Sequence, residues 1–193
     1  MGEELSTIDL RSDPTRYPLT VRDFVMLHEA GAFDQVGRVE LIEGEILQMA
    51  PMHRPHARIV PLLSIALDRA IGMIDAGLEV LAEPSAELDT HSLPQADIVV
   101  ADIADEKIVS RGTVRLLVEV AATSLGYDLG RKKRLYARAE VPEYWVADVD
   151  GRRIIRFHAP TGEDFAERAE FAFGDPIPSA TIPGLVVDTS RLV

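Results

Sequence analysis

The sequence contains no cysteine, and this absence excludes disulfide bonds and thiolate metal sites. It also fits a reducing compartment, so we expect a cytoplasmic protein. The N-terminus has no basic region followed by an apolar run and a small-residue cleavage site, so no signal peptide is expected. Apolar runs long enough to span a bilayer are missing as well, and we therefore expect no membrane partner.

Positive charge is scarce in this chain. The 193 residues include 20 Lys and Arg against 32 Asp and Glu, for a formal net charge of −12. Proteins that coat nucleic acids present broad basic surfaces, so this balance argues against that class. Any contact with DNA or RNA must therefore depend on a local basic patch.

Internal repeats and low-complexity segments are also absent from the sequence. With 47% hydrophobic and 27% charged residues, the composition is that of an ordinary globular protein. Residues 1–16 are polar and show no periodicity, which predicts a flexible N-terminal tail. The length suits one domain, and we expect it to occupy residues 17–193.

The spacing of apolar residues predicts a mixed α/β or α+β fold. The expected elements are, in order, a helix capped by Thr20 and closed by Gly31, a hairpin turning at Glu43 and Gly44, an amphipathic helix over 56–74, strands over 79–88, 97–101 and 116–124, a basic helix over 128–139, and a hairpin of strands 144–149 and 153–158. Helices early and mid-chain around a run of strands indicate a central mixed β-sheet flanked by helices.

Glu119 is a carboxylate in the middle of the apolar run LLVEVAATS at 116–124. A buried, ionised carboxylate is costly unless a partner compensates it. Asp97 opens the preceding predicted strand, so both carboxylates can face one site if the two strands are neighbours. Two like charges held that close need a cation between them, or one of them must take up a proton. An all-oxygen site without cysteine favours Mg²⁺ or Mn²⁺ over Zn²⁺.

Lys132 is singled out by its helical spacing. It is related to Leu135, Tyr136 and Ala139 by steps of three, four and seven residues, which places it on the core-facing stripe of the basic helix. A lysine on an inward face needs a charge partner, and Asp97 and Glu119 are the obvious candidates. Beside a metal, such a lysine could hold an attacking water or neutralise charge developing on a phosphate.

Several short motifs follow one another along the chain in a characteristic order. They are ELIEGE at 40–45, His56 at the start of the long helix, Asp97, VEV at 118–120, Lys132 four residues before Tyr136, and VPEYWVAD at 141–148. This ordered set resembles the Uma-type restriction endonuclease family of the PD-(D/E)XK nuclease superfamily. Ala96 stands where the family often has proline. Ala121 stands at the usual lysine position, so the lysine must come from the helix.

The resemblance implies a restriction-endonuclease-like fold with Asp97 and Glu119 as ligands of Mg²⁺ or Mn²⁺. It implies that Lys132 completes a site that hydrolyses DNA phosphodiester bonds with a metal-activated water. Glu40 and His56 would be accessory residues of this site. In a nuclease, Arg131 and Arg134 of the basic helix would form the local phosphate-contacting patch. Many enzymes of this type cut duplex DNA as dimers, and the apolar C-terminal strands would permit a homodimer.

Structural interpretations of the same residues stay open at this point. Asp97, Glu119 and Lys132 could form a buried ion network in a non-enzymatic interaction protein that keeps the nuclease fold. The strong acidity of the chain slightly favours that alternative. A third hypothesis is metal-dependent hydrolysis of RNA or of a smaller phosphodiester. Tyr136 is expected in the core, and Glu43 is expected to be only a turn residue.

Overall fold

The computed structural model describes residues 15–74 and 76–193. The predicted tail over 1–16 therefore falls almost entirely outside the described residues. Within those residues, no helix is long and apolar enough to cross a membrane.

The helical elements differ widely in length. They are α1 (Val21–Glu29), α2 (Arg54–Ile74), α3 (Leu125–Tyr127), a π-turn η1 (Asp128–Lys132), α4 (Lys133–Arg138) and a 3-10 turn η2 (Ser190–Leu192). The strands of the central sheet are β3 (Leu78–Ala82), β5 (Ile98–Asp102), β7 (Val114–Ala121), β8 (Glu143–Asp148), β9 (Arg153–Thr161) and β10 (Asp164–Ala172). Shorter pairs are formed by β1 (Val39–Ile42) with β2 (Glu45–Gln48), β4 (Ala86–Glu87) with β6 (Val109–Ser110), and β11 (Pro176–Pro178) with β12 (Val186–Asp188).

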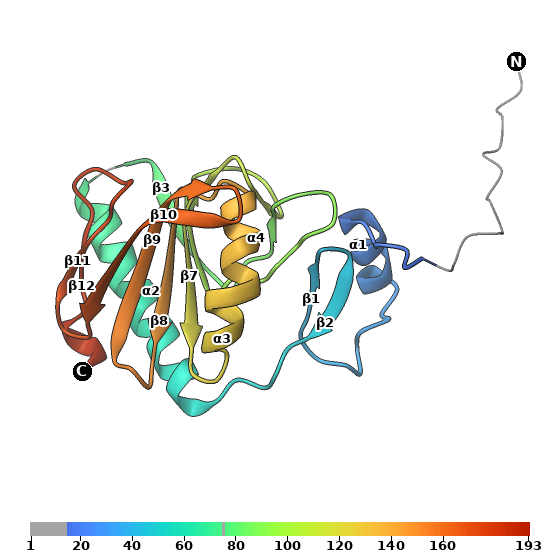
Figure 1. Ribbon diagram of the computed structural model, residues 1–193, viewed down its shortest axis with the longest axis horizontal. Helices are drawn as coiled ribbons and strands as arrows, with labels where there is room; N and C mark the ends of the chain where they lie inside the picture. Colours follow the sequence, from blue (N-terminus) through green and yellow to red (C-terminus); the bar gives the residue numbers. More distant parts are fainter. Residues whose placement is uncertain (1–14, 75) are drawn as a thin grey trace, which may run out of the picture.

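Within the described residues the central sheet has six strands in the order β10-β9-β8-β7-β5-β3. β7 and β8 run parallel, whereas the other neighbours in this sheet are antiparallel. Two parallel strands need a crossover connection, which here is formed by α3, η1 and α4 (Figure 1). The predicted mixed sheet flanked by helices is confirmed.

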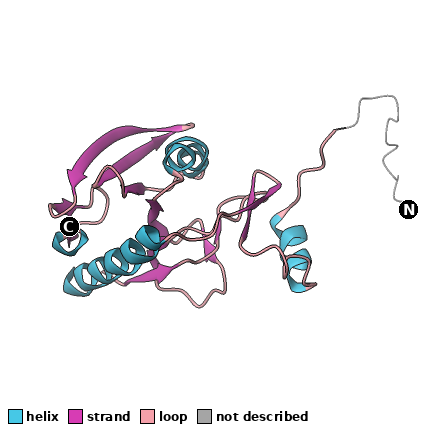
Figure 2. Cartoon of the chain, turned by 90° about the horizontal axis from the view of Figure 1, so that it is seen from below, coloured by secondary structure: helices cyan, strands magenta, loops and turns pink. Residues whose placement is uncertain are grey.

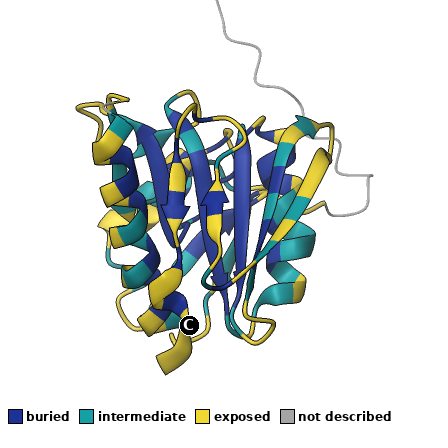
Figure 3. Cartoon of the chain, turned by 90° about the vertical axis from the view of Figure 1, so that its left-hand side faces the viewer, coloured by how far each residue is buried: buried dark blue, intermediate teal, exposed yellow. Residues whose placement is uncertain are grey.

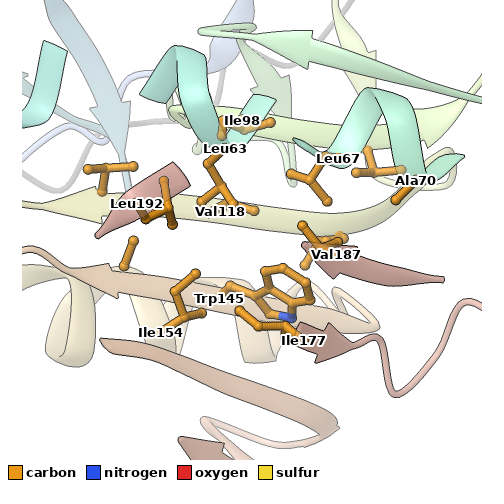
Figure 4. Packing of buried hydrophobic residues seen from close by; sticks show 14 of the residues in the cluster. Leu63, Leu67, Ala70, Ile98, Val118, Trp145, Ile154, Ile177, Val187 and Leu192 are labelled. Carbon is orange, nitrogen blue, oxygen red and sulfur yellow. The ribbon is translucent and has the colours of Figure 1, made fainter. Parts of the chain in front are cut away.

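Helices cover both faces of the sheet, so its middle strands β5, β7 and β8 are buried between them, whereas β10 at the edge is mostly exposed (Figure 3). On one face, α2 and the C-terminal segment enclose a core that contains Val118, Trp145 and Val187 (Figure 4). On the other face, α4 packs over a second core that contains Leu117 and Ala121. Alternate residues of β7 thus enter opposite cores, and Glu119 falls on the face covered by α4.

Local predictions are confirmed at the helix cap and at the hairpin. The Thr20 side chain accepts a hydrogen bond from the backbone N–H of Asp23, and the Asp23 carboxylate accepts one from the backbone N–H of Thr20 in return. Glu43 and Gly44 have φ values of 54° and 78°, as a tight two-residue hairpin turn requires. A Cβ on Gly44 would lie 2.6 Å from Cβ of Pro18, so this position needs glycine.

Two predicted elements are wrong in their extent. The strand expected over 79–88 is divided into β3 and β4, because Glu83 adopts a φ of 53° and Pro84 follows it. The basic helix expected over 128–139 begins at Leu125 and contains the π-turn η1.

The first helix and the hairpin form a lobe beside the sheet (Figure 2). This lobe has a small core of its own, built on Val21, Phe24, Leu41 and Leu93. Backbone hydrogen bonds between Leu41 and Leu93 connect the hairpin to the segment that leads into β5. The hairpin is thereby placed so that Glu40 points toward the crossover helix.

Candidate active site

A cavity of about 90 Å³ lies where the C-terminal end of β7, the first turn of α2 and the start of the crossover meet. These three segments gather at the lower edge of the sheet in Figure 1. The polar and charged residues around the cavity are Arg38, Glu40, His53, His56, Gln95, Asp97, Glu119, Thr123, Ser124, Asp128 and Lys132. A volume of this size holds a few water molecules or a hydrated cation, but not a nucleotide.

Asp97 is brought to Glu119 by the pairing of β5 with β7. Ile98 pairs with Val118, and continuation of this antiparallel register places Asp97 opposite Glu119. The Asp97 Oδ2 atom accepts a hydrogen bond of 2.7 Å from the backbone N–H of Val120. Its Oδ1 atom lies 3.0 Å from Nε2 of His56. Asp97 is therefore fixed from two sides, by β7 and by α2.

Glu119 is held by the crossover helix. Its Oε1 atom accepts hydrogen bonds from Nζ of Lys132 at 3.0 Å and from the hydroxyl of Tyr136 at 2.5 Å. Nζ of Lys132 also lies 3.2 Å from Oε1 of Glu40 on the hairpin. The lysine thus bridges two carboxylates that come from separate parts of the fold.

The π-turn determines which way Lys132 faces. Within it, the backbone N–H of Lys133 donates to the carbonyl oxygen of Asp128, five residues earlier. The hydroxyl of Tyr144 on β8 donates to the same carbonyl at 3.2 Å. π-turns inside helices are rare and occur frequently at functional sites. Here the turn is fastened to β8, and the side chain of Lys132 is only 2% exposed.

Buried acidic groups outnumber buried basic groups around this cavity. Four carboxylates, those of Glu40, Asp97, Glu119 and Asp128, are buried beside the single buried lysine. Burial raises the pKa of the Glu119 carboxyl well above its usual range, and the neighbouring carboxylates add to this increase although Lys132 opposes it. Burial would lower the pKa of Lys132, but the negative charges of Glu119 and Glu40 outweigh that effect and raise it. Lys132 is therefore protonated at neutral pH.

The two carboxylates that contact Lys132 each have one oxygen atom with no hydrogen-bonding partner among the described residues. One is Oε2 of Glu40, which is fully buried. The other is Oε2 of Glu119, whose partners all contact Oε1. Buried acceptors are normally satisfied, so Oε2 of Glu40 indicates room for a ligand that carries positive charge or donates hydrogen bonds. Glu119 lines the cavity, and its Oε2 atom is open to the same ligand.

Asp128 gives the site a pH dependence of stability. Burial raises the pKa of its carboxyl from 3.8 to about 6, so the folded state holds this proton more tightly than the unfolded chain does. Stability should therefore fall as the pH rises through that window, by about 3 kcal/mol in total. In Asp128→Asn this loss disappears, so the stability of the variant relative to wild type should increase between pH 4 and pH 7 and then level off. Urea unfolding at each pH measures the difference, and a difference that does not change with pH would contradict this assignment.

Arg131 lies outside the cavity and is engaged by the hairpin. Its Nε and Nη2 atoms each lie 2.9 Å from a carboxylate oxygen, of Glu43 and of Glu45 respectively. Arg138 pairs with Glu43 and with Glu163. The two arginines hold the hairpin, and with it Glu40, against the crossover helix. The phosphate contact predicted for Arg131 would require these ion pairs to break.

The structure brings five of the sequence-selected residues to one cavity, namely Glu40, His56, Asp97, Glu119 and Lys132. Arg131 and Arg134 do not line it. Arg134 is exposed and pairs with no carboxylate in the described part of the chain. Sequence reasoning missed Asp128 and the hydroxyl of Tyr136. Each lies four residues from Lys132 on the same helical stripe, which places both residues near the site, although their contacts there depend on the folded chain.

Comparisons with known proteins identify the family and the fold. A family model described as "Uma2: Putative restriction endonuclease" matches residues 23–190. Among solved structures, a putative nuclease of the DUF820 family from Anabaena variabilis is similar, with a TM-score of 0.67 and 17% sequence identity over 91% of this chain and 97% of that one. This likeness shows the fold. A search of curated proteins found no match.

Proposed function

The chain belongs to the Uma2 family, whose description is "Putative restriction endonuclease". From this membership and the cavity we propose a metal-dependent endonuclease that hydrolyses phosphodiester bonds of DNA. The observation that carries the proposal is the surplus of buried carboxylates, four against one lysine, around a cavity the size of a hydrated cation. A fold that needed only a structural ion network would gain stability by balancing these charges.

The donor atoms fit a hard divalent cation. Asp97 and Glu119 would hold Mg²⁺ or Mn²⁺ through carboxylate oxygens, and Oε2 of Glu119 is free of protein partners in the described structure. Histidines and carboxylates of residues 15–74 and 76–193 do not form a group of three or more arranged to hold a metal ion. Mg²⁺ commonly keeps several waters and takes only one or two carboxylates, so a pair of ligands suits it. When bound, such an ion lowers the pKa of a coordinated water and polarises the phosphate.

Lys132 acts as a hydrogen-bond donor and a positive charge, because its raised pKa keeps it protonated. An ammonium group has three donors, and two of them are used on Glu40 and Glu119. The third can orient the attacking water or bind a non-bridging phosphate oxygen, where negative charge grows in the transition state. A protonated lysine cannot remove a proton from the water, so it does not serve as the general base.

The other residues keep the carboxylates in position. Tyr136 occupies Oε1 of Glu119 and leaves Oε2 for the cation. His56 and the backbone N–H of Val120 fix both oxygens of Asp97. Because the cavity is too small for a nucleotide, only the scissile phosphate and its waters enter it. The strand to be cut must lie across the opening.

Cleavage of supercoiled plasmid tests the proposal. Wild-type protein with Mg²⁺ or Mn²⁺ is expected to convert supercoiled DNA into nicked or linear products, and EDTA should stop the reaction. Asp97→Asn, which keeps the size of the side chain and removes its charge, should lower the rate by about 10²-fold or more.

Three results would count against the proposal. Cleavage that persists unchanged in Asp97→Asn would indicate a contaminant. Absence of cleavage together with absence of Mn²⁺ binding by calorimetry would favour the non-enzymatic alternative. Cleavage of RNA but not of DNA would assign a different substrate to the same site.

A further inference from the structure

Acidic residues are distributed unevenly along this chain. Although 32 of the 193 residues are Asp or Glu, none occurs between residues 46 and 67. No other stretch of the sequence without acidic residues is as long. The same stretch contains Arg54 and Arg58 together with His53 and His56, so it is a positive segment in a protein with a net charge of −12.

These basic residues lie at the end of α2 where positive charge is least favourable. The helix begins at Arg54, and its first turn contains no acidic residue. Because the N-terminal end of a helix carries partial positive charge, acidic side chains are stabilising there and basic ones are not. A locally unfavourable choice of this kind is expected where a site serves function rather than stability. An anion bound at this turn would be attracted both by the N-terminal end of the helix and by the basic side chains.

The basic turn lies beside the cavity. His53 and His56 line the cavity, and His56 contacts Asp97. In Figure 1 the first turn of α2 lies next to the C-terminal end of β7, at the same edge of the sheet. Arg54 and Arg58 are exposed, and neither forms an ion pair with another residue in the described part of the chain.

The other basic candidates near the cavity are already neutralised. Arg131 is paired with Glu43 and Glu45, and Arg38 is paired with Glu83. A phosphate would have to compete with these carboxylates. Arg54 and Arg58 have no such competitor among the described residues, and their guanidinium groups can bind phosphate oxygens through two hydrogen bonds each.

We propose that the first turn of α2 binds the phosphodiester backbone of the DNA strand that lies across the cavity, with Arg54 and Arg58 contacting phosphates next to the scissile one. Four residues along a helix span about 6 Å, so the two arginines can reach neighbouring phosphates of one strand. The contact is to the backbone and carries no sequence information. The location of the scissile phosphate rests on the proposed function, whereas binding of DNA by this turn can be measured without cleavage.

The experiment compares two double variants that remove the same charge. Arg54→Ala/Arg58→Ala removes both arginines of the turn. The control, Arg69→Ala/Arg191→Ala, removes two exposed arginines that line a groove at the far half of α2 and likewise have no ion pair among the described residues. Binding to a fluorescein-labelled 25-base-pair duplex is followed by anisotropy in EDTA, between about 50 and 200 mM NaCl. Melting curves establish that each variant is folded.

At 50 mM NaCl the Arg54/Arg58 variant should bind the duplex at least about tenfold more weakly than wild type does. Its plot of log affinity against log salt should be less steep by about 2, because about one counterion is released per phosphate contact. The control should bind as wild type does. An equal loss of affinity in both variants would mean that only net charge matters, and this result would overturn the proposal. Unchanged binding in the Arg54/Arg58 variant would also overturn it. A wild-type protein that binds neither duplex nor single-stranded DNA would overturn it as well. DNA binding through these arginines without any metal-dependent cleavage would contradict only the proposed nuclease function.

Discussion

Replacing Lys132 with methionine is expected to reduce metal-dependent DNA cleavage by about a thousandfold or more. The substitution keeps the length of the side chain and removes the only buried cation among the residues around the cavity. The loss of one preorganised donor to a developing negative charge typically costs 10²–10³-fold in rate. Here the same change also leaves Glu40 and Glu119 without their counter-charge, so the loss should reach or exceed the upper end of that range.

Lys133→Met is the matched control for this substitution. Lys133 is the next residue, but its side chain pairs with Asp164 and lies over the ring of Phe157, away from the cavity. Cleavage by Lys133→Met should remain within a few-fold of wild type. If Lys133→Met and Lys132→Met lost activity equally, the loss would reflect general damage to the helix rather than a role for Lys132.

Lys132→Met will also be less stable, by about 3–5 kcal/mol at neutral pH, because it leaves buried carboxylates uncompensated. The pKa of Glu119 is already raised by burial, and removal of the lysine raises it further. The folded variant therefore holds that proton more tightly than the unfolded chain, so its stability should fall as the pH rises from the ordinary glutamate pKa. Glu119→Gln/Lys132→Met should recover part of the stability without recovering cleavage. That result would separate the catalytic loss from the folding defect.

Replacing Glu143 with alanine is expected to destabilise the protein by about 3–5 kcal/mol, the largest loss of stability that we expect from a residue outside the cavity. Glu143 begins β8 and is completely buried. Its Oε1 atom accepts a hydrogen bond of 2.7 Å from Nε1 of Trp145. Its Oε2 atom accepts bonds from Ser179 and Ala180 and two from Thr181. One carboxylate thus attaches the C-terminal segment to the central sheet.

Urea unfolding measures this loss, with Glu167→Ala as the control. Glu167 is exposed on β10, so its replacement should change the free energy of unfolding by less than about 0.5 kcal/mol. Glu143→Gln should be intermediate, because its amide oxygen can accept the bonds made to Oε2 while its NH₂ group faces the N–H of Trp145. A loss below about 1 kcal/mol in Glu143→Ala would mean that the C-terminal segment is held mainly by its apolar contacts.

The sequence was sufficient to predict the central part of the fold and five of the residues that line the cavity. The period-two pattern around Glu119 and the helical spacing of Lys132 each depend on local geometry, so both could be read from the chain. Glu119 and Lys132 lie side by side in the structure, with Nζ of Lys132 3.0 Å from Oε1 of Glu119. Their roles in metal binding and catalysis remain proposals.

Other features depend on contacts that no local pattern encodes. Arg131 has the spacing of a solvent-facing residue, and only the folded chain shows that it meets Glu43 and Glu45 from the hairpin. Glu43 was expected to be only a turn residue, because its ion pairs with Arg131 and Arg138 are also formed only in the folded chain. Tyr136 packs in the core as predicted, but the contact of its hydroxyl with Glu119 depends on the π-turn. A π-turn is one residue out of step with a regular helix, and no pattern in the sequence indicates it.

The parallel pairing of β7 with β8 determines when the site can assemble during synthesis. Asp97 and Glu119 meet through the antiparallel pairing of β5 with β7, and both strands leave the ribosome before the lysine does. Tyr144 of β8 holds the turn that carries Lys132, so we expect the lysine to be fixed beside the carboxylates only once β8 has paired with β7. A nascent chain that ends before β8 therefore contains Lys132 but lacks the Tyr144 contact that holds its turn. For a protein proposed to cut DNA, this order would keep incomplete chains inactive.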